Sequence, residues 1–360
     1  MEIGIVGLPN VGKSTLFNAL TSGHAASSNY PFTTIEPNVG IVSVPDPRLG
    51  RLSGLFHPEK VTPAAVKFVD IAGLVRGASQ GEGLGNQFLS HIREVDAIVH
   101  VVRLFADPGV VHTLGSVDPA RDLEIIETEL ILADIQSAEK QRDRLGGSAR
   151  TGDKESKAKL EILEKVIRTL NEGRSARLAG VTADDLRPFF FLTAKPILYL
   201  GNESEEAGDH PSPEAAKLAE AAAARGAEWL TVSAKIESEL SQFSSEEEKR
   251  SLRSDLGLVE TGLEKLIRLS YKMLRLITFF TAGPKEVRGW TLEGGGTAVD
   301  AAGKIHSDIA GGFVRAEVYR FTDIDRWGSE KALQEKGLKR SEGREYLVQD
   351  GDVCYFHFRD

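Results

Sequence analysis

Short apolar runs, separated by polar loops and amphipathic stretches, recur along most of the chain. Strands that are buried on both faces of a parallel sheet have this continuous apolar character. We expect such strands at residues 1–6, 39–44, 64–69, 97–102, 196–200 and 229–232. Helical spacing follows the first strand at 15–20 and returns at 263–269, where it should close the same domain. Strands that alternate with helices predict an α/β fold around a parallel sheet.

Two longer stretches interrupt this alternation with apolar residues at the 3-4-3 spacing of coiled-coil seams. The first seam consists of Leu123, Ile126, Leu130 and Ala133, and the second of Leu160, Leu163, Ile167 and Leu170. Residues 146–153 between them are glycine-rich and polar, which predicts a turn. We therefore expect an antiparallel α-helical coiled coil over 121–189, inserted into an α/β domain that comprises 1–120 and 190–277.

The last segment, 278–360, has a different pattern. A strand at 286–292, a helix at 301–305 and a strand at 313–318 precede a terminal hairpin over 346–356, with Asp350-Gly351 at its turn. This order predicts a small β-grasp domain. We find no catalytic combination of residues in it, so we expect an interaction module.

The most specific motif directly follows the first strand. Residues 7–15 read Gly-Leu-Pro-Asn-Val-Gly-Lys-Ser-Thr, which is the G-x-x-x-x-G-K-S pattern of a phosphate-binding P-loop. Its glycines let backbone N–H groups point at phosphate oxygens, and the next helix directs its positive dipole end there. Lys13 would reach the β and γ phosphates, and Ser14 would bind Mg²⁺. A chance glycine turn is a poor alternative in this context, so we expect nucleotide contacts from Asn10, Val11, Gly12, Lys13, Ser14 and Thr15.

Two later segments would complete a switch-type site for magnesium and the γ-phosphate. The polar, proline-broken loop 27–38 offers Thr34 as a further Mg²⁺ ligand, with Thr33 as the near alternative. An apolar strand ends at Asp70, and the D-x-x-G pattern places Gly73 after it. Asp70 can hold a Mg²⁺-bound water at the carboxyl end of a parallel strand, while the Gly73 N–H meets the γ-phosphate.

The residue after Gly73 changes the mechanism that can be expected. Signalling GTPases carry a water-orienting glutamine there, whereas this chain has Leu74, which cannot accept or donate a proton. Asn10 resembles the asparagine that holds a K⁺ ion against the phosphates in some P-loop hydrolases. His112, in the loop after strand 97–102, could orient the water, although a lone loop histidine is more often a plain surface residue. If neither acts, hydrolysis is slow and depends on a partner.

The base is expected to meet Asn202-Glu203-Ser204-Glu205, which stands where guanine-specific domains read N-K-x-D. Glu205 is one methylene longer than the aspartate that accepts both guanine N–H donors, and Glu203 replaces the lysine that packs on the base. Asn202 could bind the N6 donor and N7 acceptor of adenine with both of its amide atoms. This departure favours ATP over GTP, because a site built for one base leaves polar groups unpaired with the other. The loop Ser233-Ala234-Lys235 resembles the base-contacting S-A-K loop of the same proteins.

The composition of the chain limits which partners, metal sites and cellular location we expect. The 360 residues carry a net charge of −9, so the surface is not basic overall and we expect no DNA partner. From Lys140 to Arg177, however, 11 Lys or Arg stand against 6 Asp or Glu; this excess suits RNA phosphate, and a solvated face explains it equally well. Cys354 is the single cysteine, which excludes an internal disulfide and a multi-cysteine zinc site. We see no secretory pattern and no apolar run near the 18 or so residues that span a bilayer, so we expect a cytoplasmic protein without membrane contact.

Together these motifs resemble those of the YchF/Obg-like ATPases, in the Obg group of translation-factor-type P-loop proteins. The resemblance covers essentially the whole chain and rests on 7–15, 31–38, 70–74, 202–205 and 302–306. It implies a P-loop G-type domain, an inserted coiled coil and a C-terminal TGS domain. It also implies that ATP is preferred over GTP, with Mg²⁺ at Ser14 and Thr34, the base at Asn202 and its neighbours, and the ribosome as a partner. Leu74 fits the family's hydrophobic replacement of glutamine, whereas Thr33 stands where many members have cysteine.

We therefore expect a cytoplasmic Mg²⁺-dependent ATPase that acts as a regulatory factor linked to translation or stress. It would bind the ribosome or ribosomal RNA through the coiled coil and the TGS domain, and hydrolysis would reset it. Lys13, the P-loop amides and Mg²⁺ would stabilise the transition state, with K⁺ or a partner completing the site. The alternatives are an Obg-type GTPase, an ATP-dependent binding switch whose hydrolysis is incidental, and an RNA chaperone that uses the basic helical pair alone.

Overall fold

The computed structural model describes residues 1–23, 38–72, 84–112, 114–150, 153–207, 212–243, 248, 251 and 260–359. Within these residues the chain forms two compact units. The first unit contains residues 1–23, 38–40 and 68–262, and the second contains 41–67 and 263–359. Thr33, Thr34, Gly73 and Leu74, which the sequence assigns to the γ-phosphate end of the site, lie outside the described residues.

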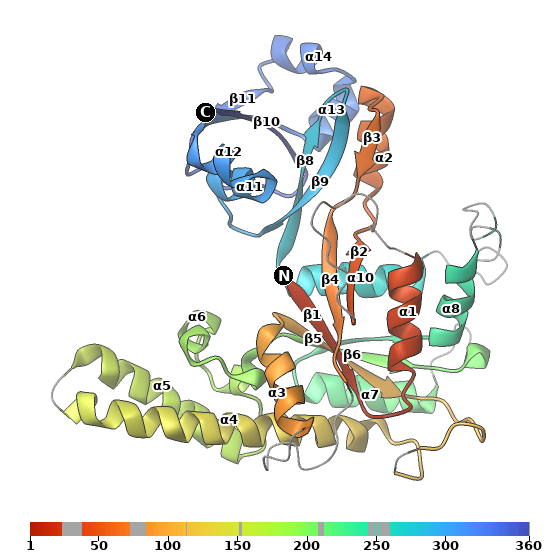
Figure 1. Cartoon of the computed structure of the whole chain (residues 1–360), viewed down its shortest axis with the longest axis vertical. Coiled ribbons are helices and arrows are strands. Elements are labelled where there is room, and N and C mark those ends of the chain that lie inside the picture. Colours follow the sequence, from red (N-terminus) through yellow and green to blue (C-terminus); the bar gives the residue numbers. More distant parts are fainter. Residues whose placement is uncertain are drawn as a thin grey trace. The chain divides into compact units, whose positions relative to one another are not determined.

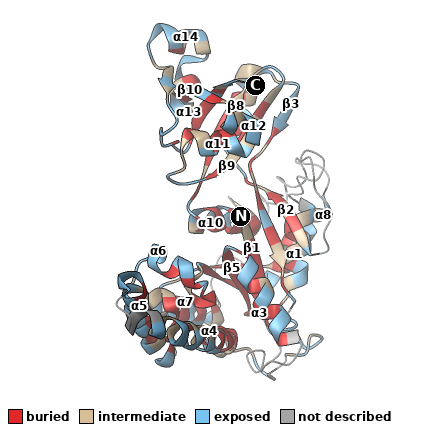
Figure 2. Ribbon diagram, turned by 60° about the vertical axis from the view of Figure 1, so that its left-hand side comes forward, coloured by how far each residue is buried: buried red, intermediate tan, exposed pale blue. Residues whose placement is uncertain are grey.

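The first unit is built on a largely parallel sheet of the strands that the sequence predicts (Figure 1). The expected parallel direction is wrong for the strand at 39–43, which runs antiparallel to its neighbour at 65–70: Val44 N donates to Ala64 O and Asp70 N to Asn38 O, each at 2.8 Å. The sheet has the order β2-β4-β1-β5-β6-β7, and parallel pairing joins β1 to β5, β5 to β6 and β6 to β7. The strand bounds are β1 Glu2–Gly7, β2 Val39–Ser43, β4 Ala65–Asp70, β5 Ala97–Arg103, β6 Ile197–Asn202 and β7 Glu228–Val232. Figure 2 shows β1 and β5 in the colour of buried residues, which explains why their sequences are continuously apolar rather than alternating.

Helices follow these strands as expected for an α/β fold. Outside the helical pair, those of the first unit are α1 Lys13–Gly23, α3 Leu84–Glu94, α6 Ala183–Leu186, α7 Pro213–Ala224 and α8 Ala234–Gln242. Short 3₁₀ turns lie at Ala176–Leu178, Arg187–Phe189, Leu192–Ala194 and Glu205–Ala207. Hydroxyl caps begin three of these helices: Thr182 accepts a hydrogen bond from Asp185 N in α6, Ser212 accepts one from Ala215 N in α7, and Ser233 accepts one from Ile236 N in α8. The cap at Ser233 fixes the start of α8 directly after the end of β7.

The two predicted seam helices are present as α4 Pro119–Arg150 and α5 Lys154–Asn171, which lie side by side in Figure 1. Their shared core includes Ile131, Leu163 and Leu170. The predicted turn over 146–153 is wrong at its start, because α4 continues through both glycines to Arg150. A glycine costs a helix interior only about 1 kcal/mol relative to alanine, which packing outweighs. Although α4 has 32 residues, no helix in the described part of the chain is long and apolar enough to cross a bilayer.

A mixed six-stranded sheet forms the second unit, in the order β11-β10-β12-β8-β9-β3. Its strands are β3 Lys60–Thr62, β8 Leu276–Ala282, β9 Glu286–Glu293, β10 Phe313–Arg320, β11 Arg340–Glu342 and β12 Asp352–Phe358. Its helices are α2 Pro47–Phe56, α10 Gly262–Met273, α11 Ala298–Ile305, α12 Ser307–Gly311, α13 Phe321–Trp327 and α14 Glu330–Glu335. The neighbours Phe279 and Phe280 belong to two different apolar clusters, since successive strand residues point to opposite faces.

The expected domain limits differ from these units at two places. Residues 263–277, assigned from the sequence to the nucleotide-binding domain, group with the C-terminal part of the chain. Residues 41–67, assigned to the same domain, do so as well. The cause is long-range strand pairing: Val61 in β3 lies opposite Val287 in β9, and Thr62 Oγ1 donates a hydrogen bond of 2.6 Å to Glu286. The three residues of β3 are too few to be recognised as a strand from their pattern alone.

The predicted terminal hairpin is also wrong. Residues 346–348 form no strand and contribute one bridge, Leu347 to Thr297, whereas β12 pairs antiparallel with β10 and parallel with β8. The Asp-Gly pair is held against the start of β8 instead: Asp350 accepts a 2.9 Å bond from Thr278 N, and Gly351 N donates a 2.8 Å bond to Thr278 O. The pair still forms a turn, closed by a 3.1 Å bond from Asp352 N to Gln349 O, but no strand precedes it to complete a hairpin.

Candidate nucleotide-binding site

The P-loop connects β1 to α1 in a conformation that only glycine permits at two positions. A Cβ on Gly7 would lie 2.8 Å from Val101 O in the neighbouring strand. Gly12 has φ +89°, and a Cβ there would lie 2.2 Å from the Asn202 Nδ2 atom. The tight loop then passes into α1, whose first turn is closed by a 3.0 Å bond from Leu16 N to Gly12 O. The N-terminus of α1, with Lys13, Ser14 and Thr15, is thus placed at the carboxyl end of the sheet, where such folds bind phosphates.

Lys13 and Asp70 form an ion pair within the site. Asp70 is the last residue of β4, and the two side chains are only 11% and 14% exposed. Asp70, which the sequence assigns to the metal, is therefore in contact with Lys13, which the sequence assigns to the phosphates. Ser14 lies exposed in the next position of the helix. In the described residues, no group of three or more His, Cys, Asp or Glu side chains could hold a metal ion by itself.

Asn202 occupies the centre of the site but does not present its amide to a base. Its Nδ2 atom donates a 2.9 Å bond to Val11 O in the P-loop, and its Oδ1 atom accepts a 2.9 Å bond from Ala234 N at the start of α8. The side chain is 5% exposed. Both amide atoms that the sequence assigns to adenine are thus engaged within the protein, and base contact by Asn202 stays a prediction. Asn202 is a brace that ties the ends of β1, β6 and β7 together.

The remaining base-loop residues lie around this brace. Glu203 accepts bonds of 2.7 and 3.2 Å from the hydroxyl and N–H of Ser212, so it anchors the start of α7. Glu205 pairs with Lys235 at 2.7 Å, and both side chains are largely exposed. That hydrogen bond raises the pKa of Lys235 above its ordinary value. Ser233 caps α8, as described above, so the loop 233–235 and the loop 202–205 are linked at two points.

His112 is held away from a role as a base. Its Nδ1 atom accepts a 3.1 Å bond from Leu114 N, so Nε2 carries the ring proton and lies 3.1 Å from the Asp122 carboxylate. Both ring nitrogens are therefore engaged, and no lone pair is left to accept a proton from water. A catalytic role of His112 would require at least one of these bonds to be exchanged, and it stays a prediction. Its imidazole instead fastens the loop after β5 to the first turn of α4.

Asn10 keeps one polar atom for a ligand. Its backbone is left-handed, with φ 64°, and its Nδ2 atom donates a 3.1 Å bond to Val111 O. The Oδ1 oxygen, the atom that a K⁺ ion would bind, has no hydrogen bond within the described residues. Asn10 and the loop that carries His112 are thus joined directly.

Arg103 is a positioning residue that the sequence analysis did not identify. It is 2% exposed at the end of β5, where its guanidinium donates to Phe105 O at 2.9 Å and to Val110 O at 3.0 Å. It also lies over the Phe105 ring, 4.4 Å from its centroid. These contacts shape the loop whose Val111 carbonyl holds Asn10. An arginine at the carboxyl end of an otherwise apolar strand is the signal that marks it.

A largely parallel sheet whose first strand leads into this P-loop, with an aspartate ending β4 beside the P-loop lysine, defines a P-loop nucleoside triphosphatase. A family model described as "50S ribosome-binding GTPase" matches residues 2–143. The model of the YchF-GTPase C-terminal domain, described as "Protein of unknown function (DUF933)", matches residues 276–359. The chain belongs to the YchF family.

Full-length relatives support this assignment. The "Ribosome-binding ATPase YchF" of Bacillus subtilis (strain 168) is 50% identical over 363 residues, covering 99% of each chain. The protein of the same name from Escherichia coli O157:H7 is 47% identical over 360 residues, again covering 99% of each chain. The solved structure of the Schizosaccharomyces pombe YchF GTPase superimposes with a TM-score of 0.90 at 37% identity, covering 99% of this chain and 97% of that one.

Proposed function

We propose that this protein is a ribosome-associated, Mg²⁺-dependent ATPase that hydrolyses ATP at the P-loop site. The observation that carries the nucleotide part is the brace of Asn202 between the P-loop and α8, with Gly12 packed against it. This brace holds the phosphate loop in shape before any ligand is bound, so its N–H groups need no reorganisation. The names of the curated relatives support ATP as the nucleotide and the ribosome as the partner.

The donor set fits magnesium. Ser14 offers an exposed hydroxyl and Asp70 a carboxylate, both hard oxygen donors, and Mg²⁺ characteristically takes few protein ligands together with water and phosphate. Thr34 would supply a further oxygen. When bound, Mg²⁺ neutralises charge on the phosphates. Nucleotide binding would transfer Lys13 from the Asp70 carboxylate to the β and γ phosphates, which frees Asp70 to hold a metal-bound water.

The attacking water would be positioned without a protein base. Lys13, the P-loop amides and the Gly73 N–H would stabilise charge on the γ-phosphate during in-line attack. Leucine at position 74 cannot orient water, and both ring nitrogens of His112 are engaged. We infer that a K⁺ ion at the Asn10 Oδ1 atom, or a group from the partner, provides the missing stabilisation.

The choice between adenine and guanine would depend on Glu203 and Glu205 rather than on Asn202. Glu203 and Glu205 both have partners within the protein, Ser212 and Lys235, so neither replaces the guanine-reading aspartate in this arrangement. This supports ATP over GTP. The solved relative from Schizosaccharomyces pombe is called a GTPase, so GTP is the competitor to test.

The helical pair and the C-terminal unit would make the ribosome contact in the cytoplasm. The charge excess over residues 140–177 supports contact with ribosomal RNA through α4 and α5. The C-terminal sheet would act as a TGS-type binding module. Association with the ribosome would then depend on the nucleotide bound in the first unit.

Isothermal titration with non-hydrolysable ATP and GTP analogues, in Mg²⁺ with K⁺ or Na⁺, tests the nucleotide part. We expect ATP to bind at least about tenfold more tightly, or about 1.4 kcal/mol, and K⁺ to accelerate phosphate release in a parallel hydrolysis assay. Equal or tighter binding of GTP would contradict the ATPase proposal. Co-sedimentation with ribosomes in each nucleotide state tests the partner, and sedimentation that ignores the nucleotide would contradict the cycle.

A further inference from the structure

A hollow of about 610 Å³ lies in the second unit, where α10 leads into β8. We call it the α10 hollow, and it contains none of the P-loop residues. Five of its lining residues are apolar, and we call them the apolar wall: Val44, Pro45, Pro47, Leu276 and Ile277. Three are cationic residues of α10 and of the turn after it, and we call them the basic wall: Arg268, Lys272 and Arg275. Its volume is within the range of sites that bind small molecules.

The three cations share one side of the chain. Arg268, Lys272 and Arg275 are spaced by four and then three residues, the spacing that brings helical side chains onto one face. All three are exposed, while Leu266, Ile267 and Tyr271 of the same helix are buried. The apolar side of α10 therefore fixes the helix and leaves its basic side at the hollow.

Arg275 is held there in an unfavourable backbone conformation. It follows the helix with φ 52°, the left-handed region in which glycine normally ends helices. A 2.9 Å bond from Arg275 N to Lys272 O fixes this turn. Within the described residues its side chain has no hydrogen bond or ion pair. Backbone strain of this kind concentrates at binding sites, and here it places an unpaired cation at the hollow.

The two carboxylates in the lining are already paired. Arg48 binds Asp46 at 2.7 Å and Asp350 at 2.6 Å, so its guanidinium lies between them. Asp350 also accepts Thr278 N. The lining thus contains four cations and two carboxylates. Arg268 and Lys272 also take part in interactions within the protein, so Arg275 is the lining cation that has no partner in the described residues.

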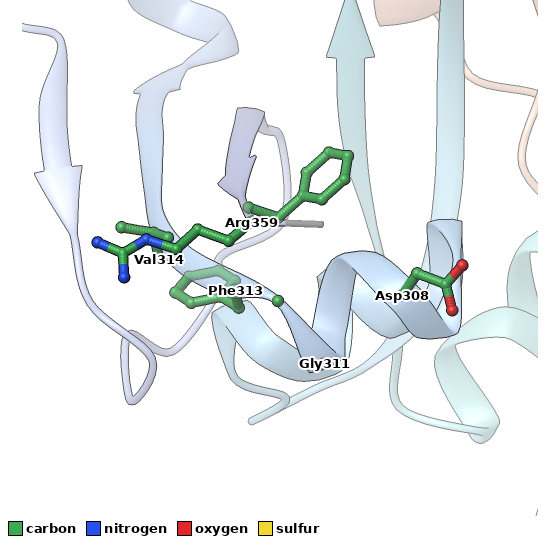
Figure 3. A pocket seen from close by; sticks show the side chains of 7 residues that line it. Asp308, Gly311, Phe313, Val314 and Arg359 are labelled. Atoms are coloured by element: carbon green, nitrogen blue, oxygen red, sulfur yellow. The ribbon is translucent and has the colours of Figure 1, made fainter.

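A second hollow of the same unit shows the contrast (Figure 3). It has about 930 Å³ and is lined by one cation, Arg359, and one carboxylate, Asp308, with Phe313, Val314 and Phe358. Arg359 and Asp308 lie at opposite ends of it in Figure 3. Its charge is balanced, so nothing in it selects an anion. It provides an arginine of the same unit as a control.

We propose that the α10 hollow is a second anion site that binds a ligand with two or more phosphate groups. The guanidinium groups of Arg268 and Arg275 can each bind phosphate oxygens with paired N–H donors, while Lys272 adds a point charge. The apolar wall suits the uncharged part of the ligand. The phosphates belong either to a small phosphorylated molecule or to an RNA strand, and both sources present the same chemistry to the three cations.

Calorimetric titration of the full chain with inorganic tripolyphosphate tests this site. The P-loop is first saturated with a non-hydrolysable ATP analogue, and Mg²⁺ is kept in excess over all phosphate. We expect one further site per chain, weakened at least about tenfold by Arg275→Gly and by Arg268→Gln. Arg359→Gln removes the same charge from the other hollow and should bind as the unchanged protein does. Thermal unfolding of each variant shows that the fold is retained.

A short single-stranded oligoribonucleotide is the second titrant and separates the two phosphate sources. Binding of the oligonucleotide but not of tripolyphosphate, again lost in Arg275→Gly, identifies the RNA backbone as the ligand. Binding of tripolyphosphate alone identifies a small phosphorylated molecule. No binding of either probe, or binding that is equal in Arg275→Gly and Arg359→Gln, overturns the proposal. Saturating the P-loop keeps this outcome independent of the ATPase proposal.

Discussion

The P-loop and the α10 hollow both suit phosphate, but they are built in opposite ways. In the P-loop, backbone shape is what matters: Gly12 is left-handed, a Cβ there would meet Asn202, and the cation Lys13 is paired with Asp70. In the hollow, side-chain charge is what matters: Arg275 is also left-handed, yet it keeps a long side chain with no partner in the described residues. A phosphate site made of backbone N–H groups tolerates no added atom. In a site made of charged side chains, the affinity for phosphate instead falls in proportion to the charge removed.

Gly12→Ala should have the largest effect. The new methyl group would meet Asn202 at 2.2 Å, in a backbone conformation that alanine rarely adopts. We expect nucleotide affinity to fall at least about 100-fold, or roughly 3 kcal/mol, by calorimetric titration. Gly54→Ala is the matched control, because Gly54 lies in α2 with nothing within 4 Å of the added atom. Nucleotide binding by Gly12→Ala at normal strength would contradict the importance of the loop's shape.

Asn202→Ala tests whether this residue braces the loop or reads the base. It leaves Val11 O and Ala234 N without partners, and unpaired buried groups cost about 1–3 kcal/mol each. We therefore expect a loss of at least about 2 kcal/mol in urea unfolding, and equal weakening of ATP and GTP binding. Asn171→Ala, at the exposed end of α5, is the control. If ATP affinity alone fell, Asn202 would contact adenine after all.

A buried histidine of the first unit, His100, should make the free energy of unfolding depend on pH. Burial lowers the pKa of His100 in β5 to about 3, from an ordinary value of 6.5. The unfolded chain therefore binds a proton below pH 6.5 that the folded chain does not, and stability falls as the pH falls toward 3. At pH 5 this amounts to about 2 kcal/mol.

His100→Phe should remove this dependence, measured as the difference in urea stability between pH 7 and pH 5. Burial raises the pKa of Asp134 to about 6, which changes stability in the opposite direction over this range. Because Asp134 is present in both proteins, its contribution cancels in the comparison. An identical pH dependence for the two proteins would show that His100 is not the group responsible.

Arg275→Gly should have the smallest effect on folding. Glycine adopts the left-handed conformation without strain, so we expect thermal stability to stay equal or rise by up to about 1 kcal/mol. Arg275→Ala removes the same charge but keeps the strain, and it should show no such gain. Both variants should lose the second anion site. A clear loss of stability in Arg275→Gly would mean that the side chain serves the fold rather than a ligand.

The P-loop, the buried strands and the helical pair could be predicted because each depends on neighbouring residues. Continuous apolar runs require burial on both faces, and the 3-4-3 seams of α4 and α5 require a partner helix. The motif at 7–15 is specific because glycine and lysine at that spacing meet one geometric need. Asp70 could be placed beside the phosphates for the same reason, since it ends a parallel strand.

Other features depend on residues far apart in the chain. Val11, whose carbonyl accepts the bond from Asn202, is 191 residues away in the sequence. The pairing of β3 with β9 joins residues 60–62 to residues 286–288. The Asp350-Gly351 pair favours a hairpin by itself, but bonds to Thr278 direct it elsewhere.

The sequence by itself determined the strands of the first sheet, the two seam helices and the P-loop motif, because local sterics and hydrophobic period decide these. Only the tertiary structure decided that Asn202 braces the P-loop and that both nitrogens of His112 are engaged. A polar side chain forms its bonds with whatever donors and acceptors the folded chain brings to it, and burial makes leaving those bonds unformed too unfavourable.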